Sequence, residues 1–193
     1  TKMSEKRSTI VTTGKVRLSY EHLIAPAAIN DGDDPKYSAS FIISKKDTKT
    51  IQLIEKAVQD AIKQGITSKW GGKKPGKLKL PLRDGDDERP DDEAYKDAYF
   101  INANCTTKYP PFIVDANKRP ITNETEIYSG CYGLGVVSFY PFDSNGNRGI
   151  ACGLLGFVKT GNGEPLASRI SVDDALEGVD LSAYVDDDDD LFD

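Results

Sequence analysis

The stretch EIYSGCYGLGVVSFYPF, residues 126–142, alternates apolar and polar side chains and is interrupted by glycines. Alternation with a period of two predicts a β-strand whose two faces meet different surroundings. The two faces carry Cys131, Val137 and Phe139 on one side and Tyr132, Ser138 and Tyr140 on the other. Because the second face is the more polar one, we expect it to point outward. Glycines inside a strand are typical of bulges and bends, so this strand should curve.

The segments on both sides extend the β pattern. Residues 143–149, DSNGNRG, are a turn signal that leads into a returning strand at 150–161. Further strand patterns occupy residues 8–23, 37–44 and 98–105, with a short strand and turn at 111–121. In the first of these, Val16, Leu18 and Tyr20 fall on one face. Strands of this length, with sharp bends and one helix, predict a mainly β fold, a small curved β-barrel.

One amphipathic helix is predicted over residues 47–64, where apolar residues recur at helical spacing. Asp47 or Thr48 can cap its start, and Gly65 can end it. Residues 66–97 follow as a long charged loop, basic in its first half and acidic in its second half, DGDDERPDDE. Loops of this length are usually functional or disordered.

The length of 193 residues fits one domain with appendages. We expect a flexible N-terminus at residues 1–9, a barrel domain at 10–172 and a disordered acidic C-terminal tail at 173–193. No apolar run approaches membrane-spanning length, and no signal-peptide pattern is present. The three cysteines lie far apart, which favours reduced, buried thiols. These features indicate a cytoplasmic protein without a membrane partner.

The net charge of −6 conceals two oppositely charged parts. Ten of the 31 acidic residues lie from Asp173 onward, where no lysine or arginine occurs. Residues 1–172 therefore carry 21 acidic and 25 basic residues, a net charge of +4. Such asymmetry indicates a body that binds a polyanion and a tail that can imitate one.

Several catalytic and metal-binding motifs fail on inspection. GGKKPGK at residues 71–77 resembles a P-loop, but Leu78 follows where a Ser or Thr must hold magnesium. DSNGNRG has calcium-loop spacing but lacks the required glycine and final glutamate. His22 is the only histidine and has no evident nucleophile partner, and no Cys/His zinc spacing exists. We therefore expect no catalytic residue, no metal and no cofactor.

Aromatic and basic residues remain as candidates for nucleic-acid binding. Exposed aromatics on strands can stack any base, and basic side chains can contact phosphates. The stacking candidates are Trp70, Tyr99, Phe100, Tyr109, Tyr128, Tyr132 and Tyr140. The phosphate candidates are Lys15, Arg17, Lys73, Lys74, Lys77, Lys79, Arg83, Arg119, Arg148 and Lys159. An ordinary mixed surface over core tyrosines explains the same residues about equally well.

Seven segments, in one order, resemble a family of phage-encoded proteins. They are KVRLSYEHL, YSASFIISKKD, LPLRDGD, YFINA, EIYSGCYGLGVVSFYPF, GNRGIACGL and GEPL, and they span about residues 10–170. This family, first catalogued as a domain of unknown function, consists of OB-fold single-stranded DNA-binding proteins. The resemblance implies an OB-type barrel, sequence-independent binding of single-stranded DNA, and service in phage replication and recombination in the host cytoplasm.

The chain ends in DDDDDLFD, and consecutive carboxylates repel one another, which predicts a solvated tail. This end resembles the acidic tails of bacterial and T7-like phage single-stranded DNA-binding proteins, although its Phe is penultimate. The resemblance implies that the carboxylates compete with DNA and that the Leu-Phe pair recruits replication or recombination proteins. The tail residues concerned are Asp186, Asp187, Asp188, Asp189, Asp190, Leu191, Phe192 and Asp193. A tail that serves only solubility is the alternative.

Two other function classes stay open at this point. The carboxylates between Asp84 and Glu93 could serve a metal-dependent nuclease or resolvase. The acidic surfaces could instead make the chain a DNA mimic that occupies a DNA-binding protein. The sequence also leaves open whether the chain forms a homo-oligomer.

Overall fold

Five long strands and one long helix make up most of the described chain. The structure is a computed structural model, and it describes residues 7–166 and 172–185. The long elements are β1 (Ile10–Ala27), β2 (Lys36–Ser44), α2 (Thr48–Ser68), β4 (Ala98–Thr106), β6 (Tyr132–Ser144) and β7 (Asn147–Gly161). The short ones are β3 (Arg83–Asp84), α3 (Gly85–Glu88), η1 (Glu93–Tyr95), β5 (Phe112–Asp115), η2 (Glu124–Glu126), α4 (Val172–Ala175) and η3 (Leu181–Tyr184).

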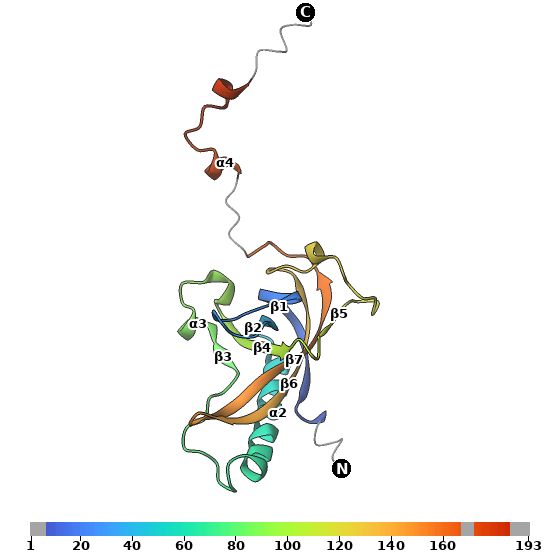
Figure 1. Cartoon of the computed structure of the whole chain (residues 1–193), viewed down its shortest axis with the longest axis vertical. Coiled ribbons are helices and arrows are strands. Elements are labelled where there is room, and N and C mark those ends of the chain that lie inside the picture. Colours follow the sequence, from blue (N-terminus) through green and yellow to red (C-terminus); the bar gives the residue numbers. More distant parts are fainter. Residues whose placement is uncertain (1–6, 167–171, 186–193) are drawn as a thin grey trace, which may run out of the picture.

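The strands close into a barrel (Figure 1). They hydrogen-bond in the order β3-β4-β2-β1-β6-β7-β5, and β4 also pairs with β7. This last pairing is parallel, aligns Asn104 with Gly153, and completes a ring of β1, β2, β4, β7 and β6. The predicted mainly β, barrel-like fold is confirmed.

The faces predicted for the strand at 126–142 are confirmed by burial. Cys131, Val137 and Phe139 are fully buried, whereas Tyr140 on the opposite face is 46% exposed. The DSNGNRG turn is the tip of the β6–β7 hairpin, where Ser144 pairs with Asn147. Alternation along β6 therefore separates the barrel core from an outer surface.

Gly133 of β6 makes room for the barrel core. The β6–β7 register shifts between Tyr132 and Gly133, as expected for a glycine bulge. A Cβ on Gly133 would collide with the Val158 carbonyl oxygen and lie 2.5 Å from the Phe157 ring. Phe157 stacks on Phe41 with ring centroids 6.0 Å apart. The missing side chain thus lets an aromatic ring fill the space beneath the strand.

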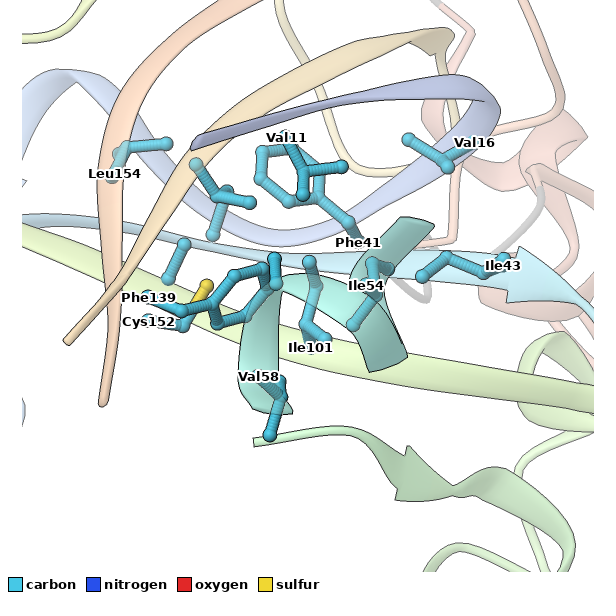
Figure 2. Close-up of a cluster of buried hydrophobic side chains, with 14 of the residues drawn as sticks. Val11, Val16, Phe41, Ile43, Ile54, Val58, Ile101, Phe139, Cys152 and Leu154 are labelled. Carbon is cyan, nitrogen blue, oxygen red and sulfur yellow. The ribbon is translucent and has the colours of Figure 1, made fainter. Parts of the chain in front are cut away.

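Helix α2 packs its apolar face on the barrel. Asp47 caps the helix by accepting a hydrogen bond from the Thr50 backbone N–H at 3.1 Å. Figure 2 shows Ile54 and Val58 in the same buried cluster as Phe41. No helix in the described ranges, including α2, is long and apolar enough to cross a membrane.

The expected helix end at Gly65 is wrong, because α2 continues to Ser68. A Cβ on Gly65 would lie 2.6 Å from the ring of Trp70. Glycine is therefore required at this position for close packing of the indole, and it does not stop the helix.

The expected long loop at 66–97 is shorter than predicted, because its second half folds onto the barrel. Tyr95, Ile42, Ala98 and Phe100 form a second buried apolar cluster. The Tyr95 hydroxyl donates to the Ser40 hydroxyl oxygen at 3.0 Å. Residues 83–97, here called the cover segment, thus lie over the outer face of β2 and β4.

Candidate nucleic-acid interface

A groove of about 360 Å³ lies beside the cover segment, across the outer face of β1, β2 and β4. Its polar and aromatic lining comes from Tyr20 and His22 of β1, Ser38 of β2, Asn102 and Asn104 of β4, and Arg89 of the cover segment. The start of the β1–β2 connection, at Ala28 and Ile29, also borders it. Concave sites of this size, with a few convergent polar groups, are typical of ligand binding.

Tyr20 reaches this groove because β1 is irregular at that point. The β1–β2 register shifts between Ser19 and His22, and Tyr20 has a φ of 46°. Such a left-handed conformation is rare for a bulky residue, and a bulge can re-aim a side chain. The Tyr20 side chain is 58% exposed, whereas Val16 and Leu18 are buried. The expected common face of these three residues is therefore wrong at Tyr20.

Arg89 places a positive charge in the groove. Its guanidinium carbon lies 5.2 Å from the ring centroid of Tyr20, 4.9 Å from that of Tyr95 and 5.0 Å from that of Phe100. These distances are typical of cation–π contacts. Sequence reasoning missed Arg89 because the residue sits inside the acidic run DGDDERPDDE.

The groove floor carries two amides with free hydrogen-bonding groups. Within the described residues, the side chains of Asn102 and Asn104 make no hydrogen bond to the protein. Each amide offers two N–H donors and a carbonyl acceptor. The sequence could have indicated these two asparagines, because they alternate along the strand with the apolar residues Ile101 and Ala103, whose side chains are buried. These amides can contact base edges, sugars or phosphates.

The acidic residues of the cover segment hold that segment in place. Lys45 Nζ lies 2.8 Å from Asp84 Oδ1 and 2.7 Å from Asp86 Oδ2. The hydrogen bond from Lys45 holds the pKa of both carboxyls below its usual range. Glu88 accepts from Arg83 at 2.6 Å, and Asp92 caps η1. Over residues 7–166 and 172–185, no group of three or more His, Cys, Asp or Glu side chains is arranged to hold a metal ion.

The seven predicted stacking residues differ in exposure. Tyr109 is 69% exposed and Tyr140 is 46% exposed, so both remain stacking candidates. Phe100 is 1% exposed and Trp70 is 6% exposed, and these two predictions are wrong because the rings are core residues. The half-buried candidates are Tyr99, Tyr128 and Tyr132.

Two of the half-buried tyrosines lie under predicted phosphate-binding residues. Lys15 Nζ is 4.7 Å from the ring centroid of Tyr132, and Arg17 is 5.5 Å from it. Lys159 Nζ lies 5.4 Å from the ring of Tyr128. The cations come from β1 and β7, whereas Tyr132 is the first residue of β6 and Tyr128 lies just before that strand. None of these residues lines the groove of Arg89.

Three predicted phosphate-binding arginines already have partners in the protein. Arg17 donates to the carbonyl oxygens of Gly130 and Glu164. Arg83 pairs with Glu88, and Arg148 pairs with Asp143 at 3.1 Å. The exposed candidates are Lys15, Lys73, Lys74, Lys77, Lys79 and Arg119. The backbone of Lys79 is hydrogen-bonded to β7. Its N–H donates to the Arg148 carbonyl oxygen, and its carbonyl oxygen accepts from the Ile150 N–H.

The predicted partner-binding tip, Asp186 to Asp190 with Leu191, Phe192 and Asp193, lies outside the described residues. The described segment 172–185 contains α4 and η3. Its apolar side chains are solvent-exposed, with Tyr184 the most exposed of them.

Comparisons with known proteins identify relatives of this chain. A family model described as "Enterobacter phage Enc34, ssDNA-binding protein" matches residues 9–192. "Putative protein p50" of Acyrthosiphon pisum secondary endosymbiont phage 1 is 33% identical over 156 residues, which is 76% of this chain and 80% of the relative.

Solved structures of phage proteins share the fold. The single-stranded DNA-binding protein from bacteriophage Enc34, solved in complex with ssDNA, matches with a TM-score of 0.73 and 25% identity over 83% of this chain and 91% of that chain. The single-stranded DNA binding protein gp2.5 encoded by bacteriophage T7 matches with a TM-score of 0.60 and 14% identity over 92% of this chain and 98% of that one. The expected OB-type barrel is confirmed by the first of these matches.

Proposed function

Because this chain belongs to the family of the Enterobacter phage Enc34 ssDNA-binding protein, we propose that it binds single-stranded DNA across the groove of β1, β2 and β4. The family resemblance seen in the sequence is confirmed by this membership. We further propose that binding is independent of sequence, that the protein serves phage replication and recombination, and that it is not an enzyme. The groove lined by Tyr20, Arg89 and Asn102 is the observation that carries the proposal.

The place of the groove on the barrel supports this proposal. OB-folds bind oligonucleotides on the face of their second and third barrel strands and on the adjoining loops. Here β2 and β4 are the second and third strands of the closed ring. The groove lies on their outer face and reaches the β1–β2 connection.

The chemistry of the groove also suits a single strand. The exposed Tyr20 ring can stack a base, a contact worth about 1–3 kcal/mol per base. Duplex bases are stacked on each other, so a single strand offers this contact more readily. Free amides and a cation in the same groove provide partners for the polar parts of a nucleotide.

A second aromatic extends the surface beyond the groove. Asn104 of the groove floor pairs across the barrel closure with Gly153 of β7. A Cβ on Gly153 would lie 3.3 Å from Tyr140 Cε1, so the Tyr140 ring covers this glycine. We propose that a strand leaving the groove over Asn104 reaches Tyr140, which gives a second stacking position.

The acidic tail gives the proposal a regulatory part that rests on the sequence. Residues 1–172 carry a net charge of +4, and the ten acidic residues from Asp173 onward oppose it. We propose that the tail competes with DNA phosphates and that Leu191 and Phe192 bind replication or recombination proteins once DNA displaces it. Competition of this kind weakens with added salt because exposed charges are screened.

The test is an anisotropy titration of fluorescent oligo-dT with the full chain and with residues 1–172, over a series of salt concentrations. We expect strong salt dependence, tighter binding by the truncated chain, and weaker binding to a duplex of equal length. Equal affinity for duplex and single strand would contradict the proposed groove. Cleavage of the oligonucleotide with magnesium or manganese would restore the nuclease hypothesis.

Absence of binding by both forms would favour the DNA-mimic hypothesis instead. The same samples can be sized by light scattering with and without oligo-dT. This measurement decides whether the chain forms a homo-oligomer and whether the DNA changes that state.

A further inference from the structure

We propose that Arg89 is the phosphate-binding residue of the groove and holds one phosphodiester of the bound strand beside Tyr20. This inference rests on the proposed function and assigns a ligand group to one residue of the same site. Arg89 would thus bind phosphate although it lies in a segment of mostly acidic residues.

Within residues 7–166 and 172–185, the guanidinium of Arg89 has no hydrogen-bond partner. Its Nε is the one buried side-chain nitrogen or oxygen without a hydrogen bond among the described residues. Arg89 also forms no ion pair with any of those residues. A buried donor left unpaired is costly, and more so when it is charged. An anion arriving in the groove would give the guanidinium an acceptor at its other two nitrogens, which are not buried.

The neighbouring charges leave this cation uncompensated. Asp84 and Asp86 are bound by Lys45, and Glu88 is bound by Arg83. Of the acidic run, the carboxylates of Asp87, Asp91 and Glu93 have neither an ion pair nor a hydrogen bond within the described residues. None of the three lines the groove. The carboxylates closest in sequence to Arg89 therefore do not neutralise it there.

The cover segment fixes the position of Arg89. Aromatic rings of Tyr20, Tyr95 and Phe100 surround its guanidinium carbon at 4.9–5.2 Å. Gly85 lets the two ends of the cover segment approach each other closely, because a Cβ there would collide with the Tyr95 carbonyl oxygen. A planar guanidinium held against ring faces can still present its edge nitrogens to a phosphate. The site is thus preorganised by packing that needs no DNA.

The test compares full-length Arg89→Gln, Arg89→Lys and the matched control Lys63→Gln in oligo-dT titrations at several salt concentrations. Lys63 is an exposed residue of α2 that does not line the groove, and its substitution removes the same charge. We expect Arg89→Gln to weaken binding roughly 10-fold to 100-fold, the loss of charged hydrogen bonds. The slope of log K against log salt should become shallower by about 0.7, the value for one phosphate on a single strand.

Arg89→Lys separates charge from geometry. It should keep the salt slope and recover only part of the affinity, because an ammonium lacks the planar fork. Wild-type affinity and slope in Arg89→Gln would overturn the assignment while leaving the proposed function intact, since the wild-type chain would still bind. An equal loss in Lys63→Gln would also overturn it, because net charge alone would explain the effect. Failure of the wild-type chain to bind oligo-dT would remove the proposed function itself.

Discussion

The indole Nε1 of Trp70 donates a hydrogen bond to the Phe142 carbonyl oxygen, 3.2 Å away. This bond joins the second residue after α2 to the C-terminal part of β6. The ring lies against Gly65 and is almost completely buried. Trp70 is therefore part of the core, although its sequence neighbours are basic and exposed.

Replacing Trp70 by alanine should lower the free energy of unfolding by about 3–5 kcal/mol, the usual cost of removing a large buried aromatic. Urea unfolding followed by circular dichroism measures this change. In the wild-type chain, Trp70 is the only tryptophan, so its fluorescence reports on one site. We expect little quenching on saturation with oligo-dT, and strong quenching with no change in fold would contradict the buried position.

Substitution of Tyr20 by glycine should raise stability and weaken DNA binding. A non-glycine residue with positive φ carries about 1–3 kcal/mol of strain, so Tyr20→Gly should raise the free energy of unfolding by roughly 1 kcal/mol. It should weaken oligo-dT binding by about 1–3 kcal/mol because a stacking ring is lost.

The matched control is Tyr20→Ala, which removes the ring and keeps the strained backbone. It should weaken binding to the same extent without the gain in stability. If Tyr20→Ala bound oligo-dT like the wild-type chain, Tyr20 would not be a stacking residue. Urea unfolding and anisotropy on the same three proteins measure both quantities.

The barrel could be predicted from the sequence because, in a regular strand, alternating apolar and polar residues point alternately into the core and outward. Along β6 the pattern separates Phe139 from Tyr140 correctly, and the predicted hairpin follows it. The prediction fails at Tyr20, where a bulge breaks the period of two. A bulge depends on pairing with a strand distant in sequence, so the local sequence pattern does not predict it.

The candidate site was harder to predict because its residues come from three separate segments. Tyr20, Asn102 and Arg89 meet only after β1, β4 and the cover segment pack together. Arg89 was not predicted as a binding residue, because a single cation among many carboxylates is usually part of a solvated acidic segment. The opposite error occurred at Arg17, which the sequence suggested as a phosphate-binding residue. Its side chain instead donates hydrogen bonds to backbone carbonyl oxygens.

The attachment of the cover segment by Lys45 should be sensitive to acid. The pKa values of Asp84 and Asp86 are lowered in the folded chain by the hydrogen bond from Lys45. This stabilisation is fully present above the ordinary Asp pKa of about 3.9. It is lost as the pH falls through the lower values of the folded state. Protonation should therefore weaken the attachment of residues 83–97 at acidic pH.

The measurement is urea unfolding of the wild-type chain and of Lys45→Met between about pH 2 and pH 7, around the Asp pKa. The wild-type chain should lose stability below about pH 4, and Lys45→Met should be less stable at neutral pH and lose less on acidification. Lys63→Met controls for loss of a surface lysine and should follow the wild-type curve. Parallel curves for wild type and Lys45→Met would show that this ion pair does not stabilise the fold.

Gly133→Ala should destabilise the barrel by about 1–3 kcal/mol, the usual cost of overpacking a core. The added methyl group would meet the Val158 carbonyl oxygen and the Phe157 ring, neither of which can move freely. Gly161→Ala in β7 is the control, because nothing lies within 4 Å of a Cβ there. Urea midpoints of the two variants measure the difference, and equal stability would contradict the close approach at Gly133.

The free amides of the groove floor should give the protein a modest preference among bases. Each hydrogen bond to a neutral group contributes about 0.5–1.5 kcal/mol, and the hydrogen-bonding edges of the bases differ. Alanine at both Asn102 and Asn104 should therefore weaken binding to oligo-dA, oligo-dC and oligo-dT by unequal amounts. Stability should change by less than about 0.5 kcal/mol, as for other surface substitutions.

Competition titrations with the three homopolymers measure this preference, and Thr106→Ala on the same strand, outside the groove, is the control. Equal weakening for all three would mean that the amides contact the sugar-phosphate backbone, which is common to every sequence. Unchanged binding to all three would contradict a strand path over β4. Because stacking on Tyr20 accepts any base, even the expected inequality is compatible with a protein that coats single strands of every sequence.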